Sequence, residues 1–424
     1  MVALDRVIAS KLDRLSVPLR VRLPSGATLG PQSAAVELVF HDPTALSRLA
    51  AGNLGALAGE VVAGKVSIDG GMRDLMKVVA ALAPDEGQGL RPPPWQRIWA
   101  NLKSAHLHSR AKDAAQIRYH YDVSDEFYQL WLDPLRVYSC AYYRDPDMDL
   151  TQAQVAKLDH ICRKLDLRKG ERFVDIGAGW GGLLFHAAEN YDVKATGITL
   201  SQNQFDHVSG MIRQKGLEKQ ITIELCDYRD FHPDRPFDKL ASVGMFEHVG
   251  RTNMASYCQC IRDLLRPGGM ALNHGITLTG LDDATVGGRL GEFIEHYIFP
   301  GGDLLHISQV IRHMSEAGLE MVDTENLRPH YARTLWAWSD RLEARLSEAE
   351  DILEQTLPPT QAGQVLRAFR LYLAGCALGF EESWTSLFQI LLTRPDGAPT
   401  AKDLPGARSS YPFRRDYIYD DRSN

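Results

Sequence analysis

The length, composition and charge of the chain indicate a folded protein with more than one domain. It has 424 residues, of which 44% are hydrophobic and 24% are charged, and these fractions are typical of globular proteins. A chain of this length exceeds a single ordinary core, so two domains are expected. The formal net charge of -7 disfavours a general attraction to nucleic acid, although a local basic patch that contacts anionic lipid is compatible with it.

The sequence predicts neither a secretory leader nor a membrane-spanning segment. Charged side chains interrupt its beginning, at Asp5, Arg6, Lys11 and Asp13, so no apolar signal segment is expected there. The most apolar uncharged run, from Leu371 to Phe380, has about half of the roughly 20 residues that cross a bilayer. None of the six cysteines belongs to a C-x-x-C pair, which favours reduced thiols. We therefore expect a cytoplasmic protein that associates transiently with the inner face of the membrane.

Residues 1–85 are predicted to form a small α+β domain. Short apolar runs bounded by turn residues indicate strands at Leu19–Leu23, Glu37–Phe40 and Val66–Ile68. Helical spacing of the apolar residues indicates helices at Pro43–Ala50 and Met72–Ala83.

A linker is predicted at residues 86–115. The segment Pro84–Pro94 is rich in proline and glycine, a composition that favours an extended connection over packed structure. A basic stretch follows from Lys103 to Arg118. A solvated helix is one interpretation of this stretch, and contact with a phospholipid headgroup is the other.

Residues 116–395 are predicted to form a second domain in which strands alternate with helices around a parallel sheet. Seven strands are indicated, at Arg172–Ile176, Val193–Ile198, Ile221–Leu225, Lys239–Val243, Met270–Leu278, Glu320–Leu327 and Leu387–Thr393. Two long insertions, at residues 279–306 and 333–385, lie where such folds place substrate specificity, and the second is predicted to be largely helical. The tail at residues 396–424 has no predicted role.

A glycine-rich turn follows the first of these strands. Gly177, Gly179 and Gly181 have the methyltransferase spacing G-x-G-x-G, whereas Gly177, Gly179 and Gly182 fit the dinucleotide spacing G-x-G-x-x-G. Glycine is needed because the turn is tight and the backbone must lie against the ligand. Asp175 precedes the turn, where a carboxylate suits the ammonium of S-adenosylmethionine and not a pyrophosphate.

The ends of the next two strands also favour a methyltransferase. The second strand ends without the acidic residue that a dinucleotide enzyme uses for the ribose. It carries instead Thr199, Ser201 and Gln204, which suit ribose hydroxyls, and Tyr228 and Arg229 follow the third strand, where adenine is expected. NAD binding and a glycine turn without a ligand are the weaker alternatives. The sequence therefore predicts an α/β fold with a seven-stranded, Rossmann-like methyltransferase domain.

Five motifs in residues 116–395 identify a resemblance to a known family. They lie at Tyr138–Tyr143, Asp175–Gly182, Thr199–Ser201, Ser242–Gly250 and Tyr297–Gly302. Their residues and order are similar to those of the cyclopropane-fatty-acyl-phospholipid synthases and the related mycolic acid cyclopropane synthases. The glycine turn is generic, but the motifs at Tyr138–Tyr143, Ser242–Gly250 and Tyr297–Gly302 in this order are specific. Before residue 116 the resemblance is weak.

The resemblance implies a lipid-handling role for the N-terminal domain and a set of site residues. In this family a bicarbonate ion acts as base, and the corresponding ligands here are Cys140, Glu247, His274, the backbone of Ile276, and Tyr331. Cys376 falls where the family has a proposed active-site cysteine. Contacts with S-adenosylmethionine are implied for Tyr138, Ser139, the glycine turn, Thr199–Gln204, Tyr228 and Arg229. The resemblance also suggests a homodimer.

These residue types fit the chemistry that the resemblance implies. An alkene is a poor nucleophile, so it must be aligned with the sulfonium methyl, and methyl transfer leaves a carbocation on the acyl chain. The site must exclude water, and a mild base must remove one proton so that the ring closes. The prediction is transfer of a methylene group to the cis double bond of phospholipid acyl chains at the bilayer surface, with bicarbonate deprotonating the carbocation.

Alternatives stay open at this point. The same cofactor and substrate class would also give a methylene- or methyl-branched chain, and a lipid-binding protein without activity is a further hypothesis. Glu247, His274 and Tyr331 taken singly also suit structural roles, and Cys376 suits packing in a helix of small residues. Zinc at Cys140, Glu247 and His274 is disfavoured because their separations lack the short pairs of metal sites, so no metal is predicted.

The chain departs from the family pattern at two places. Ala178 stands where family members usually have a cysteine, a change that a loop contacting its ligand through the backbone should tolerate. His120–Glu126 differs from the H-Y-D-x-G-N-D motif of many members. The substrate-side contacts are therefore expected to differ in detail.

Overall fold

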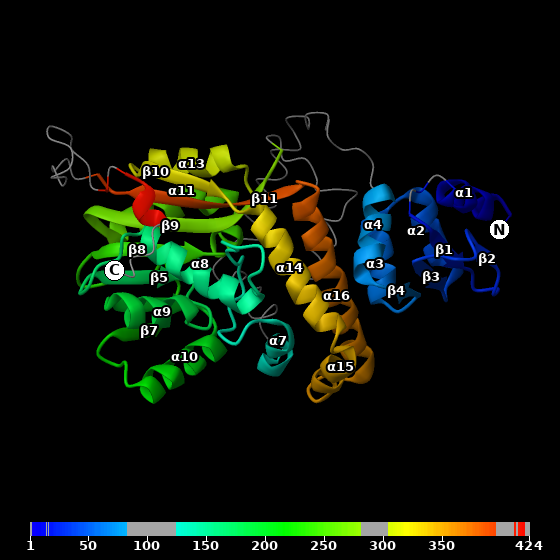
Figure 1. The fold of residues 1–424 in the computed structure, drawn as a ribbon, viewed down its shortest axis with the longest axis horizontal. Coiled ribbons are helices and arrows are strands. Elements are labelled where there is room, and N and C mark those ends of the chain that lie inside the picture. Colours follow the sequence, from blue (N-terminus) through cyan, green and yellow to red (C-terminus); the bar gives the residue numbers. More distant parts are fainter. Residues whose placement is uncertain are drawn as a thin grey trace.

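The computed structural model describes residues 2–13, 15, 17–82, 124–280, 304–395, 411–412 and 414–419. They form a seven-stranded sheet covered by helices, a layer of three helices beside it, and a four-stranded unit beyond that layer (Figure 1). Several predicted features lie outside the described residues: the linker at 86–115, the basic stretch Lys103–Arg118, the positions 120–123 of the departing motif, and the motif Tyr297–Gly302.

The large sheet is parallel except for one strand. Its strands are β5 (Arg172–Ile176), β6 (Lys194–Thr199), β7 (Ile221–Leu225), β8 (Phe237–Val243), β9 (Leu265–Leu278), β10 (Glu320–Asn326) and β11 (Thr385–Thr393). Their order is β10-β11-β9-β8-β5-β6-β7, and β11 runs antiparallel to both neighbours. All seven predicted strands and the α/β fold class are confirmed. β9 begins earlier than predicted because Leu265 already pairs with Phe237 of β8, across an irregularity in register.

Alternate side chains of the central strands enter two hydrophobic cores, one on each face of the sheet. Phe173 packs on the side of α8 (Leu150–Lys164), α9 (Gly182–Tyr191) and α10 (Gln202–Lys215). Val174 packs on the side of α11 (Met254–Leu264) and α13 (Ile307–Glu316). Successive strand residues point to opposite faces, so a strand covered on both sides is apolar throughout.

Helix α8 begins at a capping box. Asp149 Oδ1 accepts a hydrogen bond from the Gln152 amide at 2.8 Å, and Gln152 Oε1 accepts one from the Asp149 amide at 3.0 Å. Two backbone N–H groups at the helix start are thereby satisfied. The cap fixes where α8 starts and therefore which of its residues face the protein interior, among them Lys157, His160 and Lys164.

A helical layer lies between the large sheet and the N-terminal unit (Figure 1). It consists of α14 (Arg328–Glu343), α15 (Leu346–Glu354) and α16 (Pro359–Glu381), so the second predicted insertion is confirmed as largely helical. The short α7 (Asp125–Trp131) packs against it through aromatic rings. The ring centroid of Phe369 lies 5.0 Å from that of Phe127 and 6.2 Å from that of Trp131.

The N-terminal unit contains a four-stranded sheet of order β2-β1-β3-β4. The strands are β1 (Leu19–Arg22), β2 (Thr28–Leu29), β3 (Val36–Phe40) and β4 (Val66–Gly70), and the α-helices are α1 (Val2–Leu12), α2 (Leu46–Ala51), α3 (Leu54–Val62) and α4 (Met72–Leu82). The sequence prediction missed α1 and α3. Gly55 and Gly59 within α3 lower its intrinsic helix propensity, and burial of its apolar face stabilises it nevertheless.

Helices α3 and α4 pack against α16, so the N-terminal unit and the helical layer share one hydrophobic core. Arg367 Nε of α16 donates a hydrogen bond to the carbonyl oxygen of Val62 at 3.0 Å. Arg73 of α4 forms two hydrogen bonds with the Asp340 carboxylate of α14, at 3.1 and 2.6 Å.

Part of the C-terminal tail packs beside the end of α8. Tyr417 Oη donates a hydrogen bond to the carbonyl oxygen of Lys164 at 3.2 Å, and Arg415 Nη2 donates one to that of Val322 at 3.0 Å. Across the described segments of the chain, no helix combines the length and apolar content needed to cross a bilayer.

Candidate functional site

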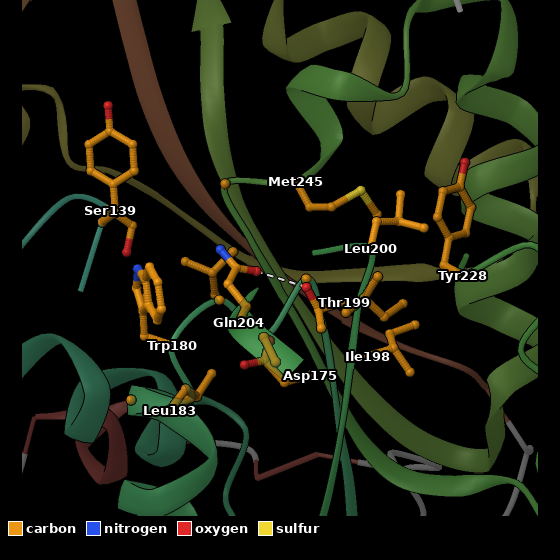
Figure 2. A pocket seen from close by; sticks show the side chains of 18 of the residues that line it. Ser139, Asp175, Trp180, Leu183, Ile198, Thr199, Leu200, Gln204, Tyr228 and Met245 are labelled. Atoms are coloured by element: carbon orange, nitrogen blue, oxygen red, sulfur yellow. Dashed lines mark hydrogen bonds between the residues drawn. The ribbon is translucent and has the colours of Figure 1, made fainter. Parts of the chain in front are cut away.

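A pocket opens at the carboxyl ends of β5, β6 and β8. The strand order reverses between β5 and β8, and ligands of doubly wound sheets bind at such a point because the connections on either side diverge. Figure 2 shows Ser139 and Trp180 on one side of the pocket and Tyr228 on the other, with Asp175 and Thr199 between them.

The glycine turn forms one wall of this pocket. Gly177, Gly179 and Gly181 have φ angles of 82°, 54° and 84°, in the left-handed region that favours glycine. A Cβ on Gly181 would lie 2.9 Å from Cε2 of Phe185, whereas a Cβ on Gly179 would meet no atom within 4 Å. The turn is therefore tight on its protein side, and at Gly179 it leaves open space beside the pocket.

Asp175, near the end of β5, is buried and lines the pocket. Its Oδ1 has no hydrogen-bond partner among the described residues. Burial raises the pKa of its carboxyl to about 7, and the Lys157 ammonium opposes that rise. A buried acceptor without a partner is costly, so a ligand cation or donor placed here would be stabilised.

The end of β6 contributes Thr199 and Gln204 to the pocket. Thr199 Oγ1 donates a hydrogen bond to Gln204 Oε1 at 2.7 Å (Figure 2). Ser201 does not line this pocket among the described residues. Its hydroxyl instead accepts a hydrogen bond from the Gln204 amide at 3.3 Å and caps α10.

The far end of the pocket is formed by residues that follow β7. Tyr228 and Arg229 both line it. Arg229 is held in place by Asp227, whose Oδ1 accepts a hydrogen bond from Arg229 Nε at 2.8 Å. The Tyr228 ring packs edge-on against Tyr257, with 5.5 Å between ring centroids. An aromatic ring and a fixed guanidinium thus flank the place where adenine is predicted.

The segment 137–139 lines the pocket next to the glycine turn, since a Cβ on Gly182 would lie 3.1 Å from Cγ2 of Val137. Helix α8 holds this segment in place. Gln154 Nε2 donates hydrogen bonds to the carbonyl oxygens of Val137 and Ser139, at 3.2 and 2.9 Å. Lys157 Nζ donates one to Ser139 Oγ at 2.9 Å. The Tyr138 hydroxyl lies 3.0 Å from that of Tyr372. Tyr138 and Ser139 therefore line the pocket in a fixed position.

Lys157 also lines the pocket, and the sequence analysis did not identify it. No sequence motif includes this residue. It lies on α8, before the glycine turn in the chain, and only the folding of the chain brings it to the pocket. The sequence did contain one indication that Lys157 is buried. It lies between Ala156 and Leu158, next to the apolar positions of an amphipathic helix.

Three of the predicted catalytic residues lie together at β9. Glu247 Oε1, on η2 (Phe246–His248), accepts a hydrogen bond from the Ile276 amide at 2.8 Å. Burial raises the pKa of Glu247 to about 7. His274 Nδ1 lies 3.2 Å from Gln389 Nε2, and burial, together with the charges of Lys157 and Lys164, lowers its pKa. The Ile276 amide, expected to hold an anion, is thus already bonded to Glu247.

Two buried atoms of this group lack partners. Glu247 Oε2 and His274 Nε2 have no hydrogen bond among the described residues. His274 and Ile276 are two positions apart on one strand, so their side chains point to the same face of the sheet. A small polar ligand at this end of β9 would satisfy either atom.

Cys140 and Tyr331 are linked to each other through Leu327. The carbonyl oxygen of Leu327 accepts a hydrogen bond from the Tyr331 amide at 3.0 Å and lies 3.9 Å from Cys140 Sγ. The Leu327 amide donates to the carbonyl oxygen of Leu387, which pairs with Ile276 across β11 and β9. Cys140 is fully buried, and burial raises the pKa of its thiol.

The predicted catalytic residues do not line the pocket themselves. Cys140 directly follows Ser139, and Glu247 lies between Met245 and His248, all three of which line it. Tyr331 packs on α14 against Phe380, with 4.7 Å between ring centroids. Cys376 lies partly buried on α16, where burial raises its pKa to about 12. The structure thus brings together Glu247, His274 and Ile276 beside the pocket, and Cys140 with Tyr331.

Comparison with known proteins gives consistent matches. Residues 108–390 match the family described as mycolic acid cyclopropane synthetase. A probable fatty acid methyltransferase of Pseudomonas putida is 43% identical over 403 residues, which cover 94% of this chain and 97% of the relative. The cyclopropane synthase MmaA2 from Mycobacterium tuberculosis is similar in structure, with a TM-score of 0.61, 34% identity and coverage of 66% of this chain and 98% of that one. The mycolic acid cyclopropane synthase CmaA1, solved with SAH and CTAB, matches with the same TM-score of 0.61, 34% identity and coverage of 66% and 98%.

We expect Gly275→Ala to destabilise the protein, because the new methyl group would lie 2.0 Å from Cε1 of the buried Phe246. Overpacking of this kind costs about 1–3 kcal/mol. Thermal unfolding should show a lowered Tm. The matched control is Gly210→Ala in α10, where an added Cβ meets no atom within 4 Å and alanine favours the helix. Equal Tm values for Gly275→Ala and the wild type would contradict the close approach of η2 to β9.

Proposed function

The chain belongs to the mycolic acid cyclopropane synthetase family, and from this we propose that it transfers a methylene group from S-adenosylmethionine to the cis double bond of phospholipid acyl chains and closes a cyclopropane ring. It is a methyltransferase of the cyclopropane synthase and fatty acid methyltransferase type. The observation that carries the proposal is the placement of buried, partnerless Glu247 and His274 atoms directly beside a pocket with the features of an S-adenosylmethionine site.

The pocket residues fit S-adenosylmethionine. The orphaned Oδ1 of Asp175 suits the ammonium of its methionine part, Thr199 and Gln204 suit the ribose, and Tyr228 suits the adenine edge. When bound, the cofactor supplies a methyl group made electrophilic by the sulfonium. The chain's own contribution is orientation: the wall at 137–139 and the glycine turn fix where that methyl lies relative to an acyl chain.

The residues beside the pocket fit a small anionic base, which we propose is bicarbonate. Bicarbonate bound there supplies a mild base close to the reacting carbon. His274 Nε2 is buried without a partner and would donate to it when protonated at that nitrogen, and Glu247 Oε2 would accept the proton that the anion carries. Because the Ile276 amide already bonds Glu247, its role in this proposal is to orient that carboxyl.

Burial of these groups serves to keep water from a cation on the acyl chain. Cys140 is fully buried, and Oε2 of Glu247 is a buried atom. Aromatic rings of Tyr331, Phe380 and Trp338 lie nearby on α14 and α16. A dry, aromatic-lined environment suits a short-lived carbocation, because water would otherwise capture it. We further propose that the acyl chain is taken from phospholipid at the cytoplasmic face of the membrane, and that the N-terminal unit handles lipid.

The decisive experiment incubates the purified protein with methyl-labelled S-adenosylmethionine and vesicles of a dioleoyl phospholipid. Label in the lipid together with upfield cyclopropane methylene signals in the proton NMR spectrum would support ring formation. Label without these signals would indicate a methylene- or methyl-branched product. Binding of vesicles without release of S-adenosylhomocysteine would leave a lipid-binding protein and overturn the proposed activity.

Glu247→Gln should lower kcat by about 10²- to 10⁴-fold, the contribution typical of a general acid or base. Affinity for S-adenosylhomocysteine should stay unchanged, since Glu247 does not line the pocket, and Tm should not fall, because Gln retains an oxygen for the Ile276 amide. Glu224→Gln, at an exposed position of β7, is the matched control. Wild-type kcat in Glu247→Gln would refute the role of this carboxyl.

Affinity for S-adenosylhomocysteine should fall as the pH drops below about 7. Burial raises the pKa of Asp175 to about 7, so its carboxyl becomes neutral below that pH and loses its attraction for the ligand ammonium. The ammonium binds the ionised form, and each pH unit below the pKa then costs up to about tenfold in affinity. Calorimetric titration between pH 5.5 and 7.5 measures this, and Asp175→Asn should bind more weakly with no such pH dependence. A flat wild-type profile would contradict the pairing.

A further inference from the structure

Lys157 places a buried ammonium in the wall of the cofactor pocket. Lys157 is 2% exposed, and it lines the pocket together with Ser139 and Asp175. Burial lowers the pKa of Lys157 to about 8, so the group is still mainly charged at neutral pH.

The charge of Lys157 is not neutralised by direct contact. Within the described residues its ammonium has one hydrogen bond, to Ser139 Oγ at 2.9 Å, and no ion pair within 4.0 Å. Asp175 shares the pocket, yet its Oδ1 has no hydrogen bond. Asp133 is also close enough to act on Lys157 electrostatically, but its two carboxylate oxygens accept hydrogen bonds from the amides of Leu135 and Val137.

A second buried lysine on the same helix is paired with a carboxylate. Lys164, fully buried on α8, forms an ion pair with Glu325 Oε2 at 2.6 Å. Burying an ammonium is costly unless it is paired. One hydrogen bond to the neutral Ser139 hydroxyl compensates only weakly for burying the charge of Lys157. A glutamine could donate the same hydrogen bond to Ser139 without a charge. The positive charge of Lys157 therefore has a use beyond holding the wall.

The arrangement matches a zwitterion. A buried cation and a buried anion line one pocket without contacting each other, so a ligand that carries both charges can pair with each. The methionine part of S-adenosylmethionine has an ammonium and a carboxylate on one carbon. With Asp175 directed at the ammonium, the carboxylate falls to the side of Ser139 and Lys157.

We propose that Lys157 is a binding residue for the carboxylate of the methionine part of the cofactor, acting beside the Ser139 hydroxyl. This inference rests on the cofactor of the proposed function but not on its lipid substrate. It gives α8 a second role, because the same side chain that holds segment 137–139 also selects a ligand with a carboxylate.

The test compares three ligands by calorimetry: S-adenosylhomocysteine, its decarboxylated analogue, and methylthioadenosine, which lacks the whole amino-acid part. The wild type should bind S-adenosylhomocysteine about 10- to 100-fold more tightly than the decarboxylated analogue, the range for a charge-assisted hydrogen bond. Lys157→Gln, which keeps a donor for Ser139 without the charge, should lose most of this preference and bind methylthioadenosine as the wild type does.

Lys194→Gln is the matched control, since it makes the same change at an exposed lysine of β6 that does not line the pocket. It should keep the wild-type preference for the carboxylate. Equal weakening of all three ligands by Lys157→Gln, or a wild type that binds the decarboxylated analogue as tightly as S-adenosylhomocysteine, would overturn the proposal. The wild-type comparison requires no variant, so it holds even if Lys157→Gln fails to fold. Because no lipid is present, failure of lipid modification leaves this result unaffected.

Discussion

Burial of ionisable side chains against the large sheet is the constraint on which the rest of the structure depends. An ionised group removed from water needs a partner, and α8 supplies partners for Glu325 of β10. Lys164 Nζ lies 2.6 Å and His160 Nε2 2.7 Å from Glu325 Oε2. Burial raises the pKa of Glu325, but the hydrogen bond from His160 and the charge of Lys164 outweigh burial and lower it to about 2. The pairing fixes α8 to β10 and so fixes the pocket wall that α8 carries.

The same constraint separates groups that hold the fold from groups that act on ligands. Glu325 is compensated by protein neighbours, whereas Asp175 and Glu247 each retain a buried oxygen without a partner among the described residues. Burial raises the pKa of both carboxyls to about 7, and it lowers that of Lys157 to about 8. Perturbed groups that lie in or beside one cleft mark a functional region. In this protein, Asp175 and Lys157 line the pocket, and Glu247 lies between two residues that line it.

Local pattern predicted much of this arrangement from the sequence. The strands, the glycine turn and Asp175 follow one another within a short stretch, so their spacing alone indicated a cofactor pocket. Two details depended on contacts between distant segments. The Ile276 amide bonds Glu247, and Lys157 reaches Ser139 from another element; no periodicity encodes such pairs. Ser201 was ambiguous for a local reason, since a serine before a helix suits both a ligand contact and the N-cap that the structure gives it.

Helix α16 is covered on two sides, and this determines how the protein unfolds. Leu366 and Phe369 belong to the same hydrophobic core as Val61 and Met76 of the N-terminal unit. Separating the N-terminal unit from the rest of the chain would therefore expose apolar side chains on both parts. Heat denaturation of the two halves should accordingly be coupled in one cooperative event. A chain shortened to begin at α7 would keep the pocket but present a bare apolar flank in water, a surface of the kind that drives self-association.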